Sequence, residues 1–555
     1  MNYKRSILFL LTATVIMSCA PVSKELPVYT THISKILSKK ESLAPQDQHI
    51  WQHKDYLRDT IPGVSTEKAL ELLRDKKANT VIIALLDTEV DIQHPTLRDQ
   101  IWINQGEIPD NGIDDDTNGY IDDIHGWNFL GNTAGENTFY TNYEYTRILK
   151  KYASKFQNKK IEDIADTDVQ DFSTYQKAKQ TYDAELKEIT ENTVQYNAIY
   201  ASYKNAQTLI GNYINADSIT LERLDSLKIA RPDLDQQITL LSNSIRYEVK
   251  EQDMLDQLEF LANSTNKYLN LSFDDRGIIG DNPEDLTDTF YGNSKVSNNV
   301  ASLYHGTLVA GVLAAKMHAN KFRGFSKKFK LMPLAISSNG DEHDKDIALA
   351  IRYAVDNGAK IINMSSGKNF SMHTTWVNDA IAYANKNEVL IVTSAGNDNQ
   401  NIDLADHIYY PNDHQLPETN NFIKVGAISQ RLDSAHFKFV NSSYGKLNVD
   451  LFAPGEDIYT TAVTKDLYDV VSGTSFATPM VAGVAGLLFS YFPELTVAEV
   501  KEILLNSGTS YEIEIAINDE TKGTPKMIPF AELSKSGKVV NAFNAVRMAQ
   551  QIAEK

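Results

Sequence analysis

Ser475 lies in a run of small residues, GTSFATP at positions 473–479, directly before a helical pattern of apolar residues. Small neighbours let a substrate backbone approach closely, and the N-terminus of a helix favours negative charge. Both properties suit a nucleophilic hydroxyl beside a developing oxyanion. The alternative is an ordinary helix N-cap, and the tripeptide Gly-Thr-Ser by itself favours that alternative because serine is a common cap.

A serine becomes a strong nucleophile beside a base that takes its proton and a third group that orients the base. Two upstream residues suit these roles. Asp87 follows an apolar run of strand length at 80–86, and His305 opens a segment of small residues at 305–315. Taken alone, Asp87 is explained as a strand-end cap and His305 as a core histidine. Their order along the chain, each in a matching local string, predicts a catalytic triad with Ser475.

These motifs resemble those of the subtilisin-like serine proteases. The family's aspartate motif matches Asp87, its histidine motif matches residues 305–311, and its nucleophile motif matches residues 473–479. The resemblance covers residues from about 78 to 130 and from about 288 to 548. It implies a serine endopeptidase that hydrolyses protein or peptide substrates through an acyl-enzyme intermediate, with no cofactor required for the chemistry.

Acyl transfer also needs hydrogen-bond donors aimed at the oxyanion. Asn397 follows a strand-like run at 389–393 and resembles the family's side-chain donor. The backbone N–H of Ser475 would be the second donor. A Gly-Asn pair is also common in plain turns, which is the alternative here.

The resemblance further implies two substrate-binding edges. Residues 363–367 would pair with the substrate backbone as an added strand, and residues 394–396 would line the pocket for the residue before the scissile bond. The residues expected to contact substrate are Ser365, Ser366, Gly367, Ser394, Ala395 and Gly396.

Two positions depart from the family pattern. Glu89 replaces the glycine that usually follows the aspartate by two positions, and it either alters the local turn or places a second carboxylate near the site. Leu308 replaces a histidine often found in the histidine motif, at a position outside the triad.

The elements that must position these residues alternate between strands and helices. Apolar runs of strand length lie at 80–86, 330–336, 360–364 and 389–393, and helical patterns lie at 346–357 and 377–387. Such alternation predicts an α/β fold with a mostly parallel sheet flanked by helices, whose strand ends gather the functional residues. We assign this peptidase domain to residues 78–548.

Residues 141–266 interrupt the domain with a polar segment that is nearly free of Gly and Pro. Two apolar stripes, over 175–213 and 234–261, predict helices packed on each other. Arg231-Pro232 separates the stripes, so an inserted α-helical hairpin is the simplest arrangement. Two other functions stay open: a binding or scaffold lipoprotein that holds a protein partner at this insertion, and a maturation protease dedicated to one partner.

The N-terminus predicts export. Lys4 and Arg5 precede an apolar run at 7–17, which is typical of a signal peptide, assigned to residues 1–18, and is too short to span a membrane. Residues 16–19 resemble the bacterial lipobox and predict lipid attachment to a membrane at Cys19, the only cysteine in the chain. The alternative is a chance cysteine near an ordinary cleavage site. Residues 19–77 are interpreted as a tether and lead-in segment.

An acidic loop predicts a structural calcium site. Asp114, Asp116, Asn118 and Asp122 place oxygen ligands at alternate positions around Gly119. A full EF-hand is not supported, because the loop lacks the final glutamate. A solvated acidic turn is an equally good explanation.

The composition excludes one large class of partner. The formal net charge is −19 and the isoelectric point about 5.1, whereas nucleic-acid binders normally present a basic face. No nucleic-acid partner is expected.

Overall fold

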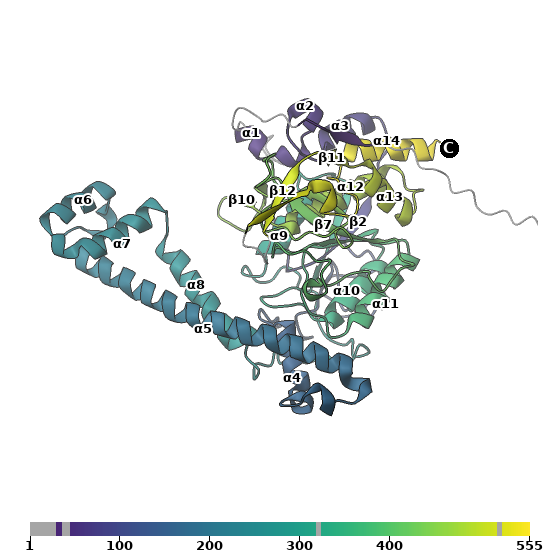
Figure 1. Ribbon diagram of the computed structural model, residues 1–555. Helices are drawn as coiled ribbons and strands as arrows, with labels where there is room; N and C mark the ends of the chain where they lie inside the picture. The colour runs from purple at the N-terminus through teal and green to yellow at the C-terminus, as the bar shows by residue number, and fades with distance from the viewer. Residues whose placement is uncertain (1–28, 36–44, 318–322, 519–523, 555) are drawn as a thin grey trace, which may run out of the picture.

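A computed structural model describes the chain except for residues 1–28, 36–44, 318–322, 519–523 and 555. Its centre is a seven-stranded sheet with the strand order β3-β4-β2-β5-β6-β7-β8, and every neighbouring pair is parallel (Figure 1). The strands are β2 (Val81–Asp87), β3 (Trp127–Asn128), β4 (Phe329–Ala335), β5 (Ile361–Met364), β6 (Leu390–Ser394), β7 (Phe422–Ile428) and β8 (Leu451–Pro454). The predicted α/β fold with a mostly parallel sheet is confirmed.

Helices cover both faces of the sheet because the central strands are apolar on both sides. In β2, Ile83 and Leu85 join one buried cluster, whereas Ala84 and Leu86 join the other. The first cluster includes side chains of α9 (Tyr304–Ala314), α12 (Thr474–Tyr491), α13 (Val497–Ser507) and α14 (Ala542–Ala553). The second includes side chains of α10 (Asp344–Asp356) and α11 (Thr374–Lys386).

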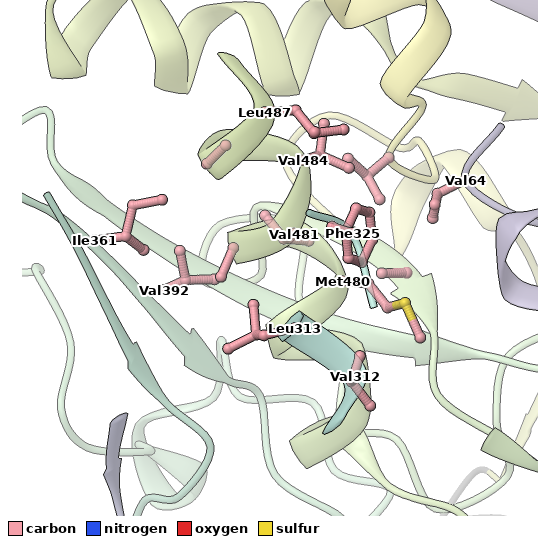
Figure 2. Packing of buried hydrophobic residues seen from close by; sticks show 14 of the residues in the cluster. Val64, Val312, Leu313, Phe325, Ile361, Val392, Met480, Val481, Val484 and Leu487 are labelled. Atoms are coloured by element: carbon pink, nitrogen blue, oxygen red, sulfur yellow. The ribbon is translucent and has the colours of Figure 1, made fainter. Parts of the chain in front are cut away.

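Helix α12 is the central helix of the first cluster. Figure 2 shows its side chains Val481 and Val484 in the same cluster as Ile361 and Val392 of the strands. Among the described residues it is the one helix long and apolar enough to cross a membrane, but 89% of it is buried inside the protein. It is therefore a core helix, and its tight packing holds its first turn firmly against the sheet.

The N-terminal segment packs on the body of the protein. Strand β1 (Thr31–Ile33) pairs with β11 (Thr509–Tyr511), and α1 (Pro45–Gln48), α2 (Tyr56–Asp59) and α3 (Thr66–Leu73) follow. Trp51 and Val64 are fully buried in the first cluster. The described residues 29–35 and 45–77 are therefore a packed segment that leads into the first core strand, and the expected tether stays a prediction. The predicted signal peptide and Cys19 lie outside the described residues.

Two short antiparallel hairpins complete the described strands. They are β9 (Ile458–Thr461) with β10 (Tyr468–Val471), and β12 (Glu514–Asn518) with β13 (Pro525–Pro529). The first hairpin also contacts α9, since the hydroxyls of Thr460 and Thr461 donate to the carbonyl oxygens of Leu308 and Thr307, each at 2.7 Å.

The insertion forms a helical arm that projects from the body (Figure 1). Its helices are α4 (Glu144–Phe156), α5 (Val169–Gly211), α6 (Leu221–Ala230), α7 (Asp235–Arg246) and α8 (Glu251–Asn263). The outgoing limb is the 43-residue helix α5, and α7 and α8 return along it. The turn of the hairpin lies at 212–220, and the helix break expected at Arg231-Pro232 follows it. Proline is tolerated at the start of a helical turn, so Pro232 merely separates α6 from α7.

Buried charges hold the base of the arm to the body. Arg147 of α4 is 5% exposed, and its Nε donates to Glu144 at 2.7 Å. Its other nitrogens donate to the carbonyl oxygens of Asn142, Asp341 and Glu342 at 2.6 to 3.0 Å. A buried guanidinium is costly unless its donors are satisfied, so this network fixes α4 against the loop that follows β4.

Candidate active site

Asp87 and His305 meet at the carboxyl end of β2. The Nδ1 atom of His305, in the first turn of α9, lies 2.6 Å from the Asp87 carboxylate, which accepts a hydrogen bond from it. Asp87 is 1% exposed, and its other carboxylate oxygen has no hydrogen-bond partner within the described part of the chain. A methyl group on Gly306 would lie within 2.8 Å of the backbone oxygens of Thr88 and Glu89, so only glycine allows α9 to begin this close to the strand.

The Asp87 carboxylate prepares His305 to accept a proton. Burial alone would lower the pKa of His305, but the charge of Asp87 and the hydrogen bond to it outweigh burial and raise the pKa above its ordinary value. The Glu342 carboxylate adds to this rise. About a third of the His305 side chain, 34%, stays exposed, so the ring remains open to a reactant.

Ser475 is the second residue of α12 and is linked to the end of β5. Its hydroxyl donates to the carbonyl oxygen of Ser365 at 2.9 Å, and the Ser365 hydroxyl donates to the carbonyl oxygen of Ser475 at 2.8 Å. The N-cap is Gly473, so the alternative of Ser475 as a capping residue is wrong. No hydrogen bond joins Ser475 to His305 among the described residues; rotation of the serine side chain to another rotamer is needed to direct it there.

Asn397 lies beside the first turn of α12. Its amide oxygen accepts hydrogen bonds from the backbone N–H of Thr474 at 2.9 Å and from the Thr474 hydroxyl at 3.0 Å. This fixes the orientation of the amide and leaves its Nδ2 donors for another acceptor. The N–H of Ser475 has no intrahelical partner either, because it belongs to the first turn. Two donors are thus available beside the serine hydroxyl.

The two expected substrate edges lie next to each other because β5 and β6 are neighbours in the sheet. The hydroxyls of Thr393 and Ser394 donate to the carbonyl oxygen of Ser366 at 3.3 and 3.4 Å. Ser366 and Gly367 are partly exposed. The buried members of the expected set are Ser365, Ser394, Ala395 and Gly396. These four residues offer backbone, and little side chain, to a ligand.

Residues 78–524 match the family described as the subtilase family. This chain belongs to that family. A cell wall-associated protease of Bacillus subtilis (strain 168) is 29% identical over 411 residues, which are 69% of this chain and 41% of the relative. A thermophilic serine proteinase of Bacillus sp. (strain AK1) is 38% identical over 188 residues, which are 34% of this chain and 42% of the relative. The chain thus spans about four tenths of the length of these two relatives.

Among solved structures, a cold-adapted subtilisin-like serine proteinase is 27% identical to this subtilase. The superposition covers 40% of this chain and 73% of that chain, with a TM-score of 0.31.

Glu89, which replaces a glycine of the subtilase pattern, holds neighbouring loops together through hydrogen bonds. It is 2% exposed, and its carboxylate accepts hydrogen bonds from the amides of Asn128 and Asn137 at 3.1 and 2.9 Å. The backbone N–H groups of Asn298 and Asn299 donate to its other oxygen at 2.6 and 3.0 Å. All of its bonds are used structurally, so Glu89 ties the loop after Asp87 to the segment that leads into α9.

The acidic loop of this subtilase brings together a different set of carboxylates from the one expected. Oxygens of Glu107, Asp114 and Asp116 lie within 4.8 Å of one another, close enough to share one calcium ion. Asp122 lies outside this group of three, and its carboxylate accepts the backbone N–H groups of residues 111 and 112. The Asn118 amide donates to Asp116 at 3.2 Å. Glu107 was missed because it precedes the loop pattern by seven residues.

Proposed function

We propose that this subtilase is a serine endopeptidase that hydrolyses peptide bonds in protein substrates. The observation that carries the proposal is the 2.6 Å contact between Asp87 and His305, whose ring centroid lies 5.9 Å from that of Phe476, the residue after Ser475. His305 removes the proton of the Ser475 hydroxyl while its oxygen bonds to the substrate carbonyl carbon. Asp87 orients the imidazole and stabilises the imidazolium that forms.

The tetrahedral intermediate that forms breaks down to an acyl-enzyme, which water then hydrolyses. The C–N bond breaks as His305 returns its proton to the leaving amine, and Ser475 keeps the acyl group as an ester. A water molecule next loses a proton to His305 as its oxygen bonds to the ester carbon. The ester C–O bond then breaks, His305 returns the proton to the Ser475 oxygen, and the carboxylic acid leaves. In both halves, the Nδ2 donors of Asn397 and the N–H of Ser475 bind the negative oxygen.

Hydrolysis of an unfolded protein tests this proposal. We expect the wild type to cut casein, or one protein that it matures, and to produce new amino termini. Ser475→Ala should lower kcat by about 10⁶-fold. Equal hydrolysis by Ser475→Ala would refute the proposal. Absence of casein cleavage together with cutting of one co-expressed protein would favour the dedicated maturation protease.

Export and lipid attachment at Cys19 are part of the proposal. The signal-like pattern of residues 1–18 and the lipobox-like residues 16–19 support it. Cells grown with labelled palmitate are expected to label the wild type and not Cys19→Ser. Labelling of both, or of neither, would contradict the lipid anchor.

The arm offers a surface for a protein partner. Ile229 and Tyr247 at its outer part are 84% and 75% exposed. Crosslinking in cells is expected to join a protein to a photoreactive residue at position 247 and not to one at exposed Val440 of the body. Equal crosslinking at both positions would remove this part of the proposal.

We further propose that Glu107, Asp114 and Asp116 bind a structural calcium ion. Calcium is expected to raise the melting temperature of the wild type, since a ligand that binds only the folded state stabilises it. Asp116→Asn should reduce the rise and Asp122→Asn should leave it nearly unchanged. No rise at millimolar calcium would contradict the site.

A further inference from the structure

We infer that Tyr409 fills the pocket for the residue before the scissile bond and restricts this residue to small side chains. The inference rests on the proposed peptidase function and specifies its substrates. Tyr409 lies outside every motif of the sequence, in the segment between β6 and β7.

The phenol end of Tyr409 lies between the two substrate edges. A methyl group placed on Gly367 would lie 2.5 Å from Cε1 and 2.8 Å from Cζ of the ring. A methyl group placed on Gly396 would lie 3.0 Å from Cε2 and 3.1 Å from Cζ. Opposite sides of one ring therefore contact the two glycines. The ring fills the space between the two substrate edges at Gly367 and Gly396.

The ring is held in this position from several sides. The backbone groups of Tyr410 and Lys368 exchange two hydrogen bonds, at 3.0 and 2.8 Å, so the Tyr409 segment runs beside the first edge. Lys424 donates to the carbonyl oxygen of Tyr409 at 2.7 Å, and its ammonium lies 5.3 Å from the ring centroid. A ligand side chain would have to break these contacts to move the ring away.

The position of the ring relative to the nucleophile identifies the substrate residue concerned. The scissile carbonyl carbon must lie at the Ser475 hydroxyl, with its oxygen toward Asn397. The α-carbon before that carbonyl is one bond away, about 1.5 Å, so its side chain emerges beside Gly396, the neighbour of Asn397. Tyr409 occupies the space into which this side chain would extend. Gly, Ala or Ser fit above the ring, whereas Phe or Leu overlap it.

Three quenched fluorescent peptides that differ only in this residue, Ala, Leu or Phe, test the inference. The wild type should cleave the Ala peptide with a kcat/KM at least about 10-fold above that for the Phe peptide, since pocket fit discriminates by about 10- to 200-fold. Tyr409→Ala should raise kcat/KM for the Phe peptide by a factor in that range and change the Ala peptide little. Tyr409→Phe, which keeps the ring, should retain the wild-type preference. Mass spectrometry locates the cleaved bond.

The outcomes separate this inference from the proposed function. Fluorophosphonate titration counts active sites in each preparation. If the wild type is not titrated, both the peptidase function and the preference for small residues before the scissile bond are refuted. If it is titrated but cleaves the Phe peptide as well as the Ala peptide, or if Tyr409→Ala leaves the ratio unchanged, only the role of Tyr409 is refuted. Tyr409→Leu provides the same comparison if Tyr409→Ala does not fold, and the wild-type ratio is decisive without any variant.

Discussion

The Ser365 hydroxyl donates a hydrogen bond to the carbonyl oxygen of Ser475 at 2.8 Å and supplies the partner that α12 itself cannot. In a regular helix the N–H four residues later would donate to this carbonyl. That residue is Pro479, which has no N–H. The nucleophile-bearing turn is therefore completed by β5 of the sheet. Asn363 in turn donates to the Ser365 hydroxyl at 2.9 Å and orients it.

This relationship predicts a compensating pair of substitutions. Ser365→Ala leaves a partly buried carbonyl unsatisfied and should lower the free energy of unfolding by about 1–3 kcal/mol. Pro479→Ala restores the helical N–H, so it should recover part of that loss in the Ser365→Ala background. Urea unfolding of the four proteins, all carrying Ser475→Ala to prevent autolysis, measures the coupling. Strictly additive effects would contradict it.

Replacement of Asp87 should reduce catalysis while Glu89, two positions away, should matter for stability alone. Asp87→Asn should lower kcat by about 10⁴-fold, because the imidazole loses its orienting charge. Glu89→Gln replaces the carboxylate, which accepts from two backbone N–H groups, with an amide. It should lower the free energy of unfolding by about 1–3 kcal/mol and leave kcat per titrated site unchanged. A large loss of kcat in Glu89→Gln would show that its carboxylate acts on the reaction.

The activity should depend on pH through His305. Only the neutral imidazole accepts a proton, so kcat/KM falls as the pH drops through the pKa of this group. Because that pKa is raised, the acid limb should lie above pH 6.5, the ordinary value. Glu342→Gln keeps an acceptor for the Ser337 hydroxyl but removes a charge that raises the pKa, so the limb should move to lower pH. An acid limb below pH 6.5, or one that Glu342→Gln leaves in place, would contradict this electrostatic arrangement.

Asn397→Leu should lower kcat by about 10²- to 10³-fold with a small change in KM, since an oxyanion donor acts mainly in the transition state. Thr474→Val is the matched control, because it removes one of the two hydrogen bonds that orient the amide and keeps the backbone N–H bond. Its loss should be much smaller. Equal losses in both variants would indicate a structural role for Asn397.

The strand and helix positions of the sheet domain could be predicted because buried parallel strands and core helices leave continuous local patterns. Asp87, His305 and Ser475 could be proposed as a set for the same reason, since each lies in a short string at an element end; their catalytic roles stay predictions. The expected fold follows from these local signals without any knowledge of distant contacts.

Contacts between distant residues left no such signal. Tyr409 meets Gly367 and Gly396 only after β5, β6 and the following segment have assembled. Likewise, the spacing of the acidic loop includes Asp122 among the expected ligands. In the structure its backbone is left-handed, with a φ of 53°, and its carboxylate accepts hydrogen bonds from the preceding turn at residues 111 and 112. Side-chain direction in loops is a tertiary property, and spacing alone does not encode it.

Covalent capture of the nucleophile is the most direct test of the central claim that Asp87 and His305 activate Ser475. The serine oxygen bonds to the phosphorus of a fluorophosphonate, the P–F bond breaks to release fluoride, and the serine proton passes to His305. Peptide mass spectrometry then identifies the modified residue. We expect one adduct per wild-type chain, on Ser475, with labelling slowed strongly in Asp87→Asn and abolished in Ser475→Ala. An unlabelled wild type, or an adduct on a different serine that persists in Ser475→Ala, would contradict the claim.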